Sequence, residues 1–157
     1  MHTRIYQLTG AVPDMSTEEI ISTAEHTLIQ RVVPNTRFSH VKRTDAPPES
    51  LQSDAGRAYI TSAFDNTQAT VESNLETLKN TLCSDESIAV DVLLNHSQAR
   101  NAAFVLGQDR GTATYLYTPS GWGIRTQDEL DEFIEHNDVT GNDNDEYFAV
   151  VPFRGKH

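Results

Sequence analysis

Apolar residues alternate with a period of two in some segments of this sequence and follow a helical period in others, and the order of these segments restricts the fold. Arg4–Val12 is rich in β-forming residues and ends before Pro13, which predicts a strand. Ser16 and Glu19 form the pattern of a capping box, in which each side chain satisfies the other residue's backbone N–H. We therefore predict a helix from Ser16 that stops at Pro34. Its apolar face consists of Ile21, Ala24, Leu28 and Val32.

The following segments predict two strands, a second helix and a fourth strand. The two strands are Thr36–Thr44 and Arg57–Phe64, with a loop at Asp45–Gly56 between them. Asp65-Asn66-Thr67 has the chemistry of an N-cap. The fourth strand is Ser87–Asn95, where apolar and polar residues alternate. The second helix carries an apolar stripe with spacings of i, i+4, i+7 and i+11, which predicts that its residues lie in the core; they are Val71, Leu75, Leu78 and Leu82.

The resulting order over residues 1–96, βαββαβ, is that of a ferredoxin-like split βαβ unit. Right-handed crossovers would place both helices on one face of an antiparallel sheet. Residues 97–157 add a hairpin of Ala102–Gly107 and Thr112–Thr118, a short helix that begins at Thr126, and a final strand, Glu146–Phe153. No long linker or internal repeat separates the halves. We therefore predict one α+β domain with a mostly antiparallel sheet and a shared core.

The charge of the chain indicates its environment. The 157 residues include 23 Asp and Glu but only 12 Lys and Arg, so the formal net charge is −11, and only three residues are lysines. This composition resembles that of proteins from halophilic archaea and their viruses, and an ordinary acidic protein is the alternative. It argues against a general electrostatic affinity for nucleic acid or anionic lipid.

The same sequence predicts where the protein works. No segment approaches the roughly 20 apolar residues that span a bilayer, so we expect no membrane association. The first residues lack the apolar core of a secretory signal. We expect a cytoplasmic protein, or one assembled into a particle in the cytoplasm.

The patterns of common catalytic and cofactor sites do not occur in the sequence. Its six histidines lack the spacing of a zinc site, and there is no Walker loop, nucleophile elbow or dinucleotide motif. We predict no catalytic residue, no cofactor and no metal. Cys83 follows the apolar stripe, which favours a small buried side chain. Asn137–Glu146 offers oxygen ligands of the kind that calcium binds but does not match an EF-hand, so we expect a solvated loop. The glycines beside Trp122 are expected to let its ring fold onto the core.

Two segments with aromatic residues resemble parts of RNA-recognition modules. Those modules share the βαββαβ order and stack bases on aromatic side chains of their first and third strands. Tyr6 lies on the predicted first strand, and Arg57, Tyr59 and Phe64 lie on the predicted third strand. The resemblance implies RNA binding through these four residues. The alternative is that the three aromatic side chains pack beneath the second half of the chain.

The hypothesis we favour is a non-catalytic subunit that binds other protein chains, in a virus particle or another large assembly. The final strand alternates apolar residues on one face and runs into basic residues, which would complement an acidic partner. The predicted partner-binding residues are Tyr147, Val151, Phe153, Arg154, Lys156 and His157. A small enzyme on a ferredoxin-like scaffold, with a site assembled from Tyr59, His40 and Asp91, is a further alternative because a fold does not define an activity.

The net charge of −11 leads to a prediction about stability in salt. Mutual repulsion of carboxylates destabilises the folded chain, and at ~1 M salt the Debye length falls to about 3 Å. We expect the thermal midpoint, measured by circular dichroism, to be clearly higher in ~2 M than in ~0.1 M potassium chloride. A midpoint that is constant or falls with salt would contradict the halophilic interpretation.

Overall fold

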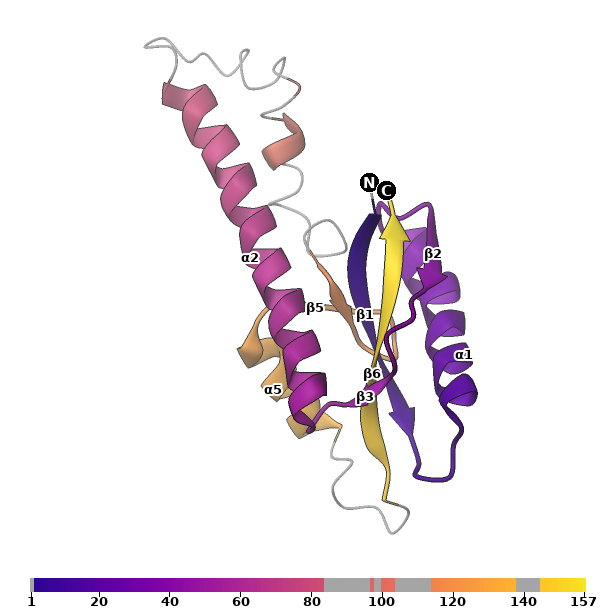
Figure 1. Cartoon of the computed structure of the whole chain (residues 1–157). Coiled ribbons are helices and arrows are strands. Elements are labelled where there is room, and N and C mark those ends of the chain that lie inside the picture. The colour runs from indigo at the N-terminus through magenta and orange to yellow at the C-terminus, as the bar shows by residue number, and fades with distance from the viewer. Residues whose placement is uncertain (1, 84–96, 98–99, 104–113, 138–144) are drawn as a thin grey trace.

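The computed structural model describes residues 2–83, 97, 100–103, 114–137 and 145–157, and Figure 1 shows its ribbon. In this part of the chain the strands are β1 (His2–Ala11), β2 (His40–Arg43), β3 (Glu49–Ser50), β4 (Leu116–Tyr117), β5 (Gly123–Ile124) and β6 (Tyr147–Lys156). The helices are α1 (Thr17–Thr27), α2 (Asp54–Cys83) and α5 (Gln127–His136). A π-helical turn, Leu28–Val32, and a 3-10 turn, Val33–Asn35, follow α1.

The sheet is built around an antiparallel pair formed by β1 and β6. Their register runs without interruption from His2 opposite Lys156 to Ala11 opposite Tyr147. The strands β2 and β3 join the free side of β6, β4 joins β1 in parallel, and β5 joins β4. Strands from both ends of the sequence therefore form one mostly antiparallel sheet, which confirms the predicted α+β class of ferredoxin-like style.

Helices cover both faces of this sheet (Figure 1). Tyr6 of β1 stacks on Tyr59 of α2 with ring centroids 5.3 Å apart. On the opposite face, Arg43 of β2 forms ion pairs with Glu18 and Glu25 of α1 at 2.6 Å each. The prediction that both helices of the first half lie on one face is therefore wrong. The chain crosses the sheet from β1 to β2 after α1 and returns from β3 to β4 after α2. Because parallel crossovers are right-handed, crossovers in opposite directions place their helices on opposite faces.

Helix α1 begins as its sequence predicts. The Ser16 side chain accepts a hydrogen bond from the Glu19 backbone N–H, and the Glu19 carboxylate accepts one from the Ser16 N–H. Its buried residues continue through the π-helical turn, and Ile21 is only partly buried because Ile20 takes the inner position. The residues on the sheet side are Ile20, Ala24, Leu28 and Val32.

The predicted third strand, Arg57–Phe64, is wrong because this segment lies inside α2. The helix starts at Asp54, where the Ser53 hydroxyl accepts a hydrogen bond from the Gly56 N–H. Residues that face the sheet follow a helical spacing of i, i+4, i+7 and i+11; they are Gly56, Ile60, Ala63 and Thr67, all buried. Gly56 is required here, since a Cβ at that position would overlap the Ser50 carbonyl of β3. The predicted N-cap at residues 65–67 is therefore mid-helix.

The apolar stripe predicted for the core lies farther along the same helix. Leu75 is 51% exposed, and Val71 and Leu78 are only partly buried, so the prediction of core positions is wrong for Leu75. Figure 1 shows the reason: α2 leans away from the sheet along its length, and its second half passes beyond the sheet edge. The side chains of Leu82 and Cys83 lie outside the described residues.

The second half of the chain agrees with the predictions in part. Thr126 caps α5 by accepting a hydrogen bond from the Glu129 N–H, while the Glu129 carboxylate accepts one from the Arg125 N–H. The final strand is confirmed and extends past Phe153 to Lys156. Residues 100–103 are helical rather than strand. The predicted strand Ser87–Asn95 and the hairpin turn lie outside the described residues.

The different burial of two leucines predicts different effects of their replacement on the free energy of unfolding. Leu130 of α5 is 3% exposed and Leu75 of α2 is 51% exposed. Leu130→Ala should lower the free energy of unfolding by ~2 to 5 kcal/mol because it leaves a cavity, whereas Leu75→Ala should lower it by less than about 1 kcal/mol. Urea unfolding of both variants measures the difference. Equal losses would contradict the position of α2.

Candidate functional site

A cluster of positively charged side chains lies at one end of the sheet, on the face toward α2. Arg154 of β6 stands directly opposite Arg4 of β1 on one side and Lys42 of β2 on the other. Two residues along the strands, Lys156 stands opposite His2 and His40 in the same way. Residues two apart on a strand project to the same face, so the six side chains form two rows of three. We call this surface the cationic face.

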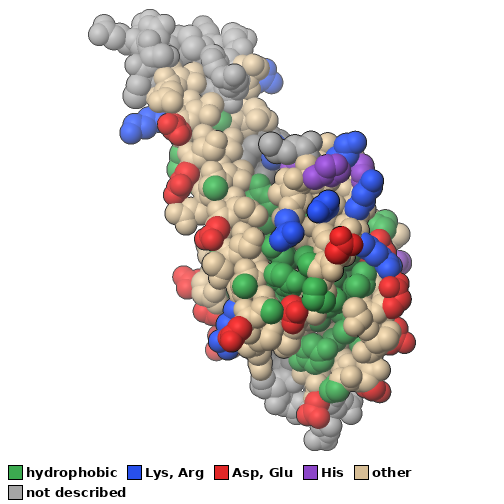
Figure 2. All heavy atoms as spheres, viewed as in Figure 1, with side chains coloured by type: hydrophobic (Ala, Val, Ile, Leu, Met, Phe, Trp, Pro, Cys, Tyr) green, Lys and Arg blue, Asp and Glu red, His purple; other side chains and the backbone are tan. Residues whose placement is uncertain are grey.

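The cationic face is open to solvent. Five of its six residues are exposed and His40 is partly exposed. Figure 2 shows Lys, Arg and His side chains gathered at the end of the sheet where both chain termini lie. The rest of the described surface carries a mixture of charges in which acidic residues predominate.

No carboxylate of the described residues forms an ion pair with the cationic face. Arg4, Lys42, Arg154 and Lys156 have no Asp or Glu oxygen within 4.0 Å in this part of the chain, unlike Arg43 on the opposite face of β2. Hydrogen bonds from Arg43, and after it Ser22, hold the pKa of Glu18 below its ordinary value. Arg43 is therefore neutralised by carboxylates of its own chain, whereas the basic side chains of the cationic face are not neutralised by any described residue.

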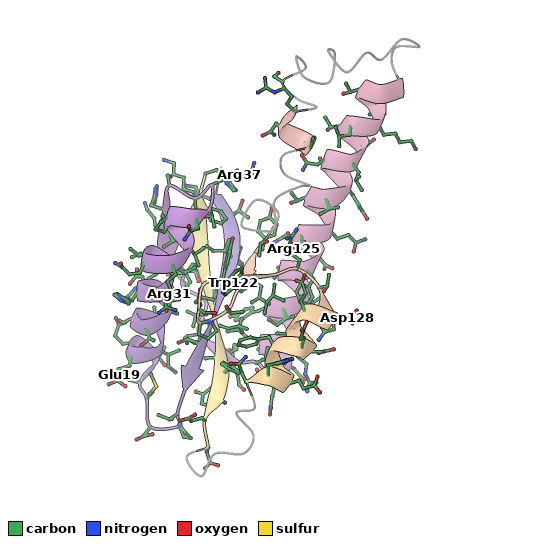
Figure 3. All side chains as sticks on the ribbon, turned by 180° about the vertical axis from the view of Figure 1, so that it is seen from behind. Glu19, Arg31, Arg37, Trp122, Arg125 and Asp128 are labelled. Atoms are coloured by element: carbon green, nitrogen blue, oxygen red, sulfur yellow. The ribbon has the colours of Figure 1, made fainter. Side chains whose placement is uncertain are left out.

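The positive charges of the cationic face repel one another, since Arg154 lies opposite both Arg4 and Lys42. Like charges directly opposite on neighbouring strands destabilise a sheet. The pKa of His2 lies below 6.5, first because of desolvation and then because of nearby positive charges that include Lys156 and Lys42. The pKa of His157 is also lowered, by burial and then by Arg37, which Figure 3 shows at the same end of the sheet. This surface therefore disfavours further positive charge and favours an anion.

The backbone beneath the cluster is fixed by packing on the other face. Gly155 lies between Arg154 and Lys156 and points toward the ring of Phe38, where a Cβ would come within 2.6 Å of a ring carbon. The Lys156 carbonyl accepts hydrogen bonds from the Ser39 N–H at 2.7 Å and from the Ser39 hydroxyl at 3.1 Å. The end of β6 is thus an ordered part of the sheet rather than a free tail.

The structure separates the predicted partner-binding residues. Val151 and Phe153 are 2% and 0% exposed, so they belong to the core and do not form a free apolar strand face. Tyr147 is partly buried at the opposite end of β6. The three remaining residues lie together, with Arg154 and Lys156 in the cationic face and His157 beside it, its ring 4.8 Å from that of Phe38.

The residues of the RNA-binding alternative are not arranged as a stacking platform. Arg57, Tyr59 and Phe64 are on α2 rather than on a strand. Tyr6 is 1% exposed beneath Tyr59 and donates a hydrogen bond to Ser62. Tyr6 and Tyr59 thus pack against each other between β1 and α2, both in the first half of the chain.

Two residues of the enzyme alternative, Tyr59 and His40, form hydrogen bonds to different neighbours and not to each other. The Tyr59 hydroxyl donates to the Pro47 carbonyl at 2.9 Å, and a ring nitrogen of His40 contacts the Ser39 hydroxyl at 3.2 Å. Asp91 lies outside the described residues. Within the described ranges no group of three His, Cys, Asp or Glu side chains could hold a metal ion, and residues 138–144 of the acidic loop are outside these ranges. No helix of the described part is sufficiently long and apolar to span a membrane.

Hollows also lie elsewhere on the described surface. A groove of about 990 Å³ between α2, α5 and the start of β6 has an apolar floor that includes Ile60, Leu130 and Phe148. A smaller pocket of about 250 Å³ is lined by Arg31 and Trp122, among others. Trp122 is 54% exposed, so the expectation that its ring folds onto the core is wrong.

The sequence contains a signal for the cationic face that none of the predictions used. Three segments have a basic residue at positions one and three: His2-Thr3-Arg4, His40-Val41-Lys42 and Arg154-Gly155-Lys156. On a strand, each would present both basic residues to one face. That the three strands are neighbours in register is decided by the sheet topology.

Comparison with known proteins identifies the family. Searches of curated proteins and of solved structures gave no match. Residues 41–141 match the family described as "Domain of unknown function (DUF7995)". The matched range includes Lys42 and helix α5 but not β1 or β6. Because the match covers more than half of the 157 residues, the chain belongs to the DUF7995 family.

Proposed function

We propose that this protein is a non-catalytic subunit that binds an acidic surface of another protein through its cationic face. The observation that supports the proposal is the double row of basic side chains without a carboxylate partner among the described residues. In a chain with 23 acidic and 12 basic residues, an internal carboxylate could easily have neutralised this surface. An external anion would remove the repulsion between neighbouring strands.

The dimensions and charge of the site favour protein carboxylates over nucleic acid. Three strands spaced ~4.8 Å apart give a surface about 10 Å wide, and two residues along a strand add about 7 Å. A nucleic acid that extended beyond this surface would meet the acidic remainder of a chain with a net charge of −11, which would repel it. The exposed large apolar residues of the described part do not include an aromatic on the cationic face, so bases would find no stacking platform.

We also propose that the protein works in the high salt of a halophilic archaeal cell. An acidic, Lys-poor chain suits the cytoplasm of a halophilic archaeon, or a virus particle or other assembly formed there. Screening at high salt weakens exposed ion pairs, so several neighbouring pairs would be needed to fix the orientation of the partner. The four permanently charged side chains of the cationic face, Arg4, Lys42, Arg154 and Lys156, meet that requirement.

Charge reversal on β6 tests the proposed function. Octaglutamate should bind the intact chain, and Arg154→Glu/Lys156→Glu should weaken that binding at least tenfold, equivalent to about 1.4 kcal/mol. Arg57→Glu/Lys79→Glu changes the net charge equally at exposed positions of α2 and should leave binding within about twofold, since charges beyond the Debye length of about 8 Å are screened at 0.15 M salt. Fluorescence anisotropy of a labelled peptide measures the affinities.

Two results of the same titration would contradict the proposal. One is equal binding of octaglutamate by the two double variants. The other is tighter binding of single-stranded oligothymidylate than of octaglutamate to the intact chain, which would make nucleic acid the better ligand.

The imidazole of His2 provides an independent test. Its folded pKa is below the ordinary 6.5, so the unfolded chain binds its proton more readily, and the fold loses stability through this group as the pH falls below about 6.5. In Lys156→Gln the pKa of His2 should rise without fully reaching 6.5, because desolvation, the larger cause, remains. NMR titration of the imidazole signals measures the pKa. An unchanged value in Lys156→Gln, or a rise of equal size in Lys79→Gln, would contradict the described cluster.

A further inference from the structure

Helix α5 carries an acidic stripe that complements the cationic face. Four of its carboxylates lie on the side opposite its buried Leu130, at the spacing of one helical face; they are Asp128, Asp131, Glu132 and Glu135. All four residues are exposed, and none forms an ion pair with a described residue. Figure 3 shows Asp128 on the outer side of α5, directed away from the sheet.

The two surfaces match in size as well as in charge. From Asp128 to Glu135 the helix rises about 10 Å at ~1.5 Å per residue. The cationic face is also about 10 Å wide across its three strands. Four carboxylates would meet four permanently charged basic side chains: Arg4, Lys42, Arg154 and Lys156.

Within one molecule these surfaces cannot meet. Phe133 of α5 packs on Phe148 near the start of β6, with ring centroids 5.1 Å apart. Lys156 is eight residues farther along the same strand, roughly 27 Å away at ~3.4 Å per residue. Figure 1 shows α5 beside the opposite half of the sheet from the chain termini. Complementary surfaces on distant parts of one chain can combine only between copies.

We infer that the acidic partner of the cationic face is α5 of a second copy of this chain. This inference rests on the proposed function, because it names the occupant of the same site. The contact joins two different surfaces, so it is heterologous: one copy retains an unused α5 and the other retains an unused cationic face. Such contacts produce closed rings or open filaments rather than a simple symmetric pair.

Salt determines where the contact can be observed. The net charge of −11 repels two copies at long range, but at 0.15 M salt the Debye length is about 8 Å. Under that condition the complementary charges at the contact dominate the interaction. Sedimentation velocity should therefore show concentration-dependent association near 0.15 M salt that weakens in molar salt, with circular dichroism confirming the fold in each condition.

Charge exchange provides the decisive experiment. Arg154→Glu/Lys156→Glu and, separately, Glu132→Lys/Glu135→Lys should each shift the association at least tenfold toward monomer. An equal mixture of the two double variants should associate again, because the unaltered α5 of the first variant then meets the unaltered cationic face of the second, and the two reversed surfaces also have opposite charge. Glu72→Lys/Glu76→Lys reverses two exposed carboxylates of α2 but leaves the cationic face and α5 unchanged, so this variant alone should associate as the intact chain does.

The results separate this inference from the proposed function. If the intact chain is monomeric at every concentration yet binds octaglutamate through Arg154 and Lys156, the self-association is wrong and the proposed function stands. If association survives either reversal, or the mixture of complementary variants does not associate, the α5 contact is overturned. If the chain neither associates nor binds octaglutamate, both the inference and the proposed function fail.

Discussion

The antiparallel pairing of β1 with β6 is the constraint on which the rest of the structure depends. The strands β2 and β3 attach only to β6, β4 attaches to β1, and β5 attaches through β4. Both central strands are continuously buried over half of their length, from Ile5 to Thr9 and from Ala149 to Phe153. Any change that separates this pair would therefore remove the support of every other strand and expose both layers of the core.

The same pairing creates the candidate binding surface. It places Arg4 beside Arg154 and His2 beside Lys156, and β2 extends each row by one residue. Repulsion between these side chains lowers the stability of the sheet end. The core beneath, with Phe38 packed on Gly155, holds the strands together despite this repulsion. A surface that is held together by packing while its charges repel is suited to binding an anion, because its geometry is fixed before the partner arrives.

Much of the local structure follows from the sequence because it depends on interactions between near neighbours. The capping box of Ser16 and Glu19, the cap at Thr126 and the strands β1 and β6 were all predicted correctly. The segment Arg57–Phe64 was mistaken for a strand, since a short apolar run fits either period. The residues of α2 that face the sheet include only one large apolar side chain, so they gave a weaker pattern than Leu75 and Leu78; they are Gly56, Ile60, Ala63 and Thr67.

The sequence by itself determined the α+β composition, the two helix starts, the long final strand and the excess of acidic charge. Each of these depends on residues within a few positions of one another or on a sum over the chain. The tertiary structure alone decided that β6 lies between β1 and β2, that the helices cover opposite faces, and that three short basic segments form one surface. The physical reason is that strand order is fixed by packing of residues more than a hundred positions apart, and local periodicity contains no information about which strand will be the neighbour.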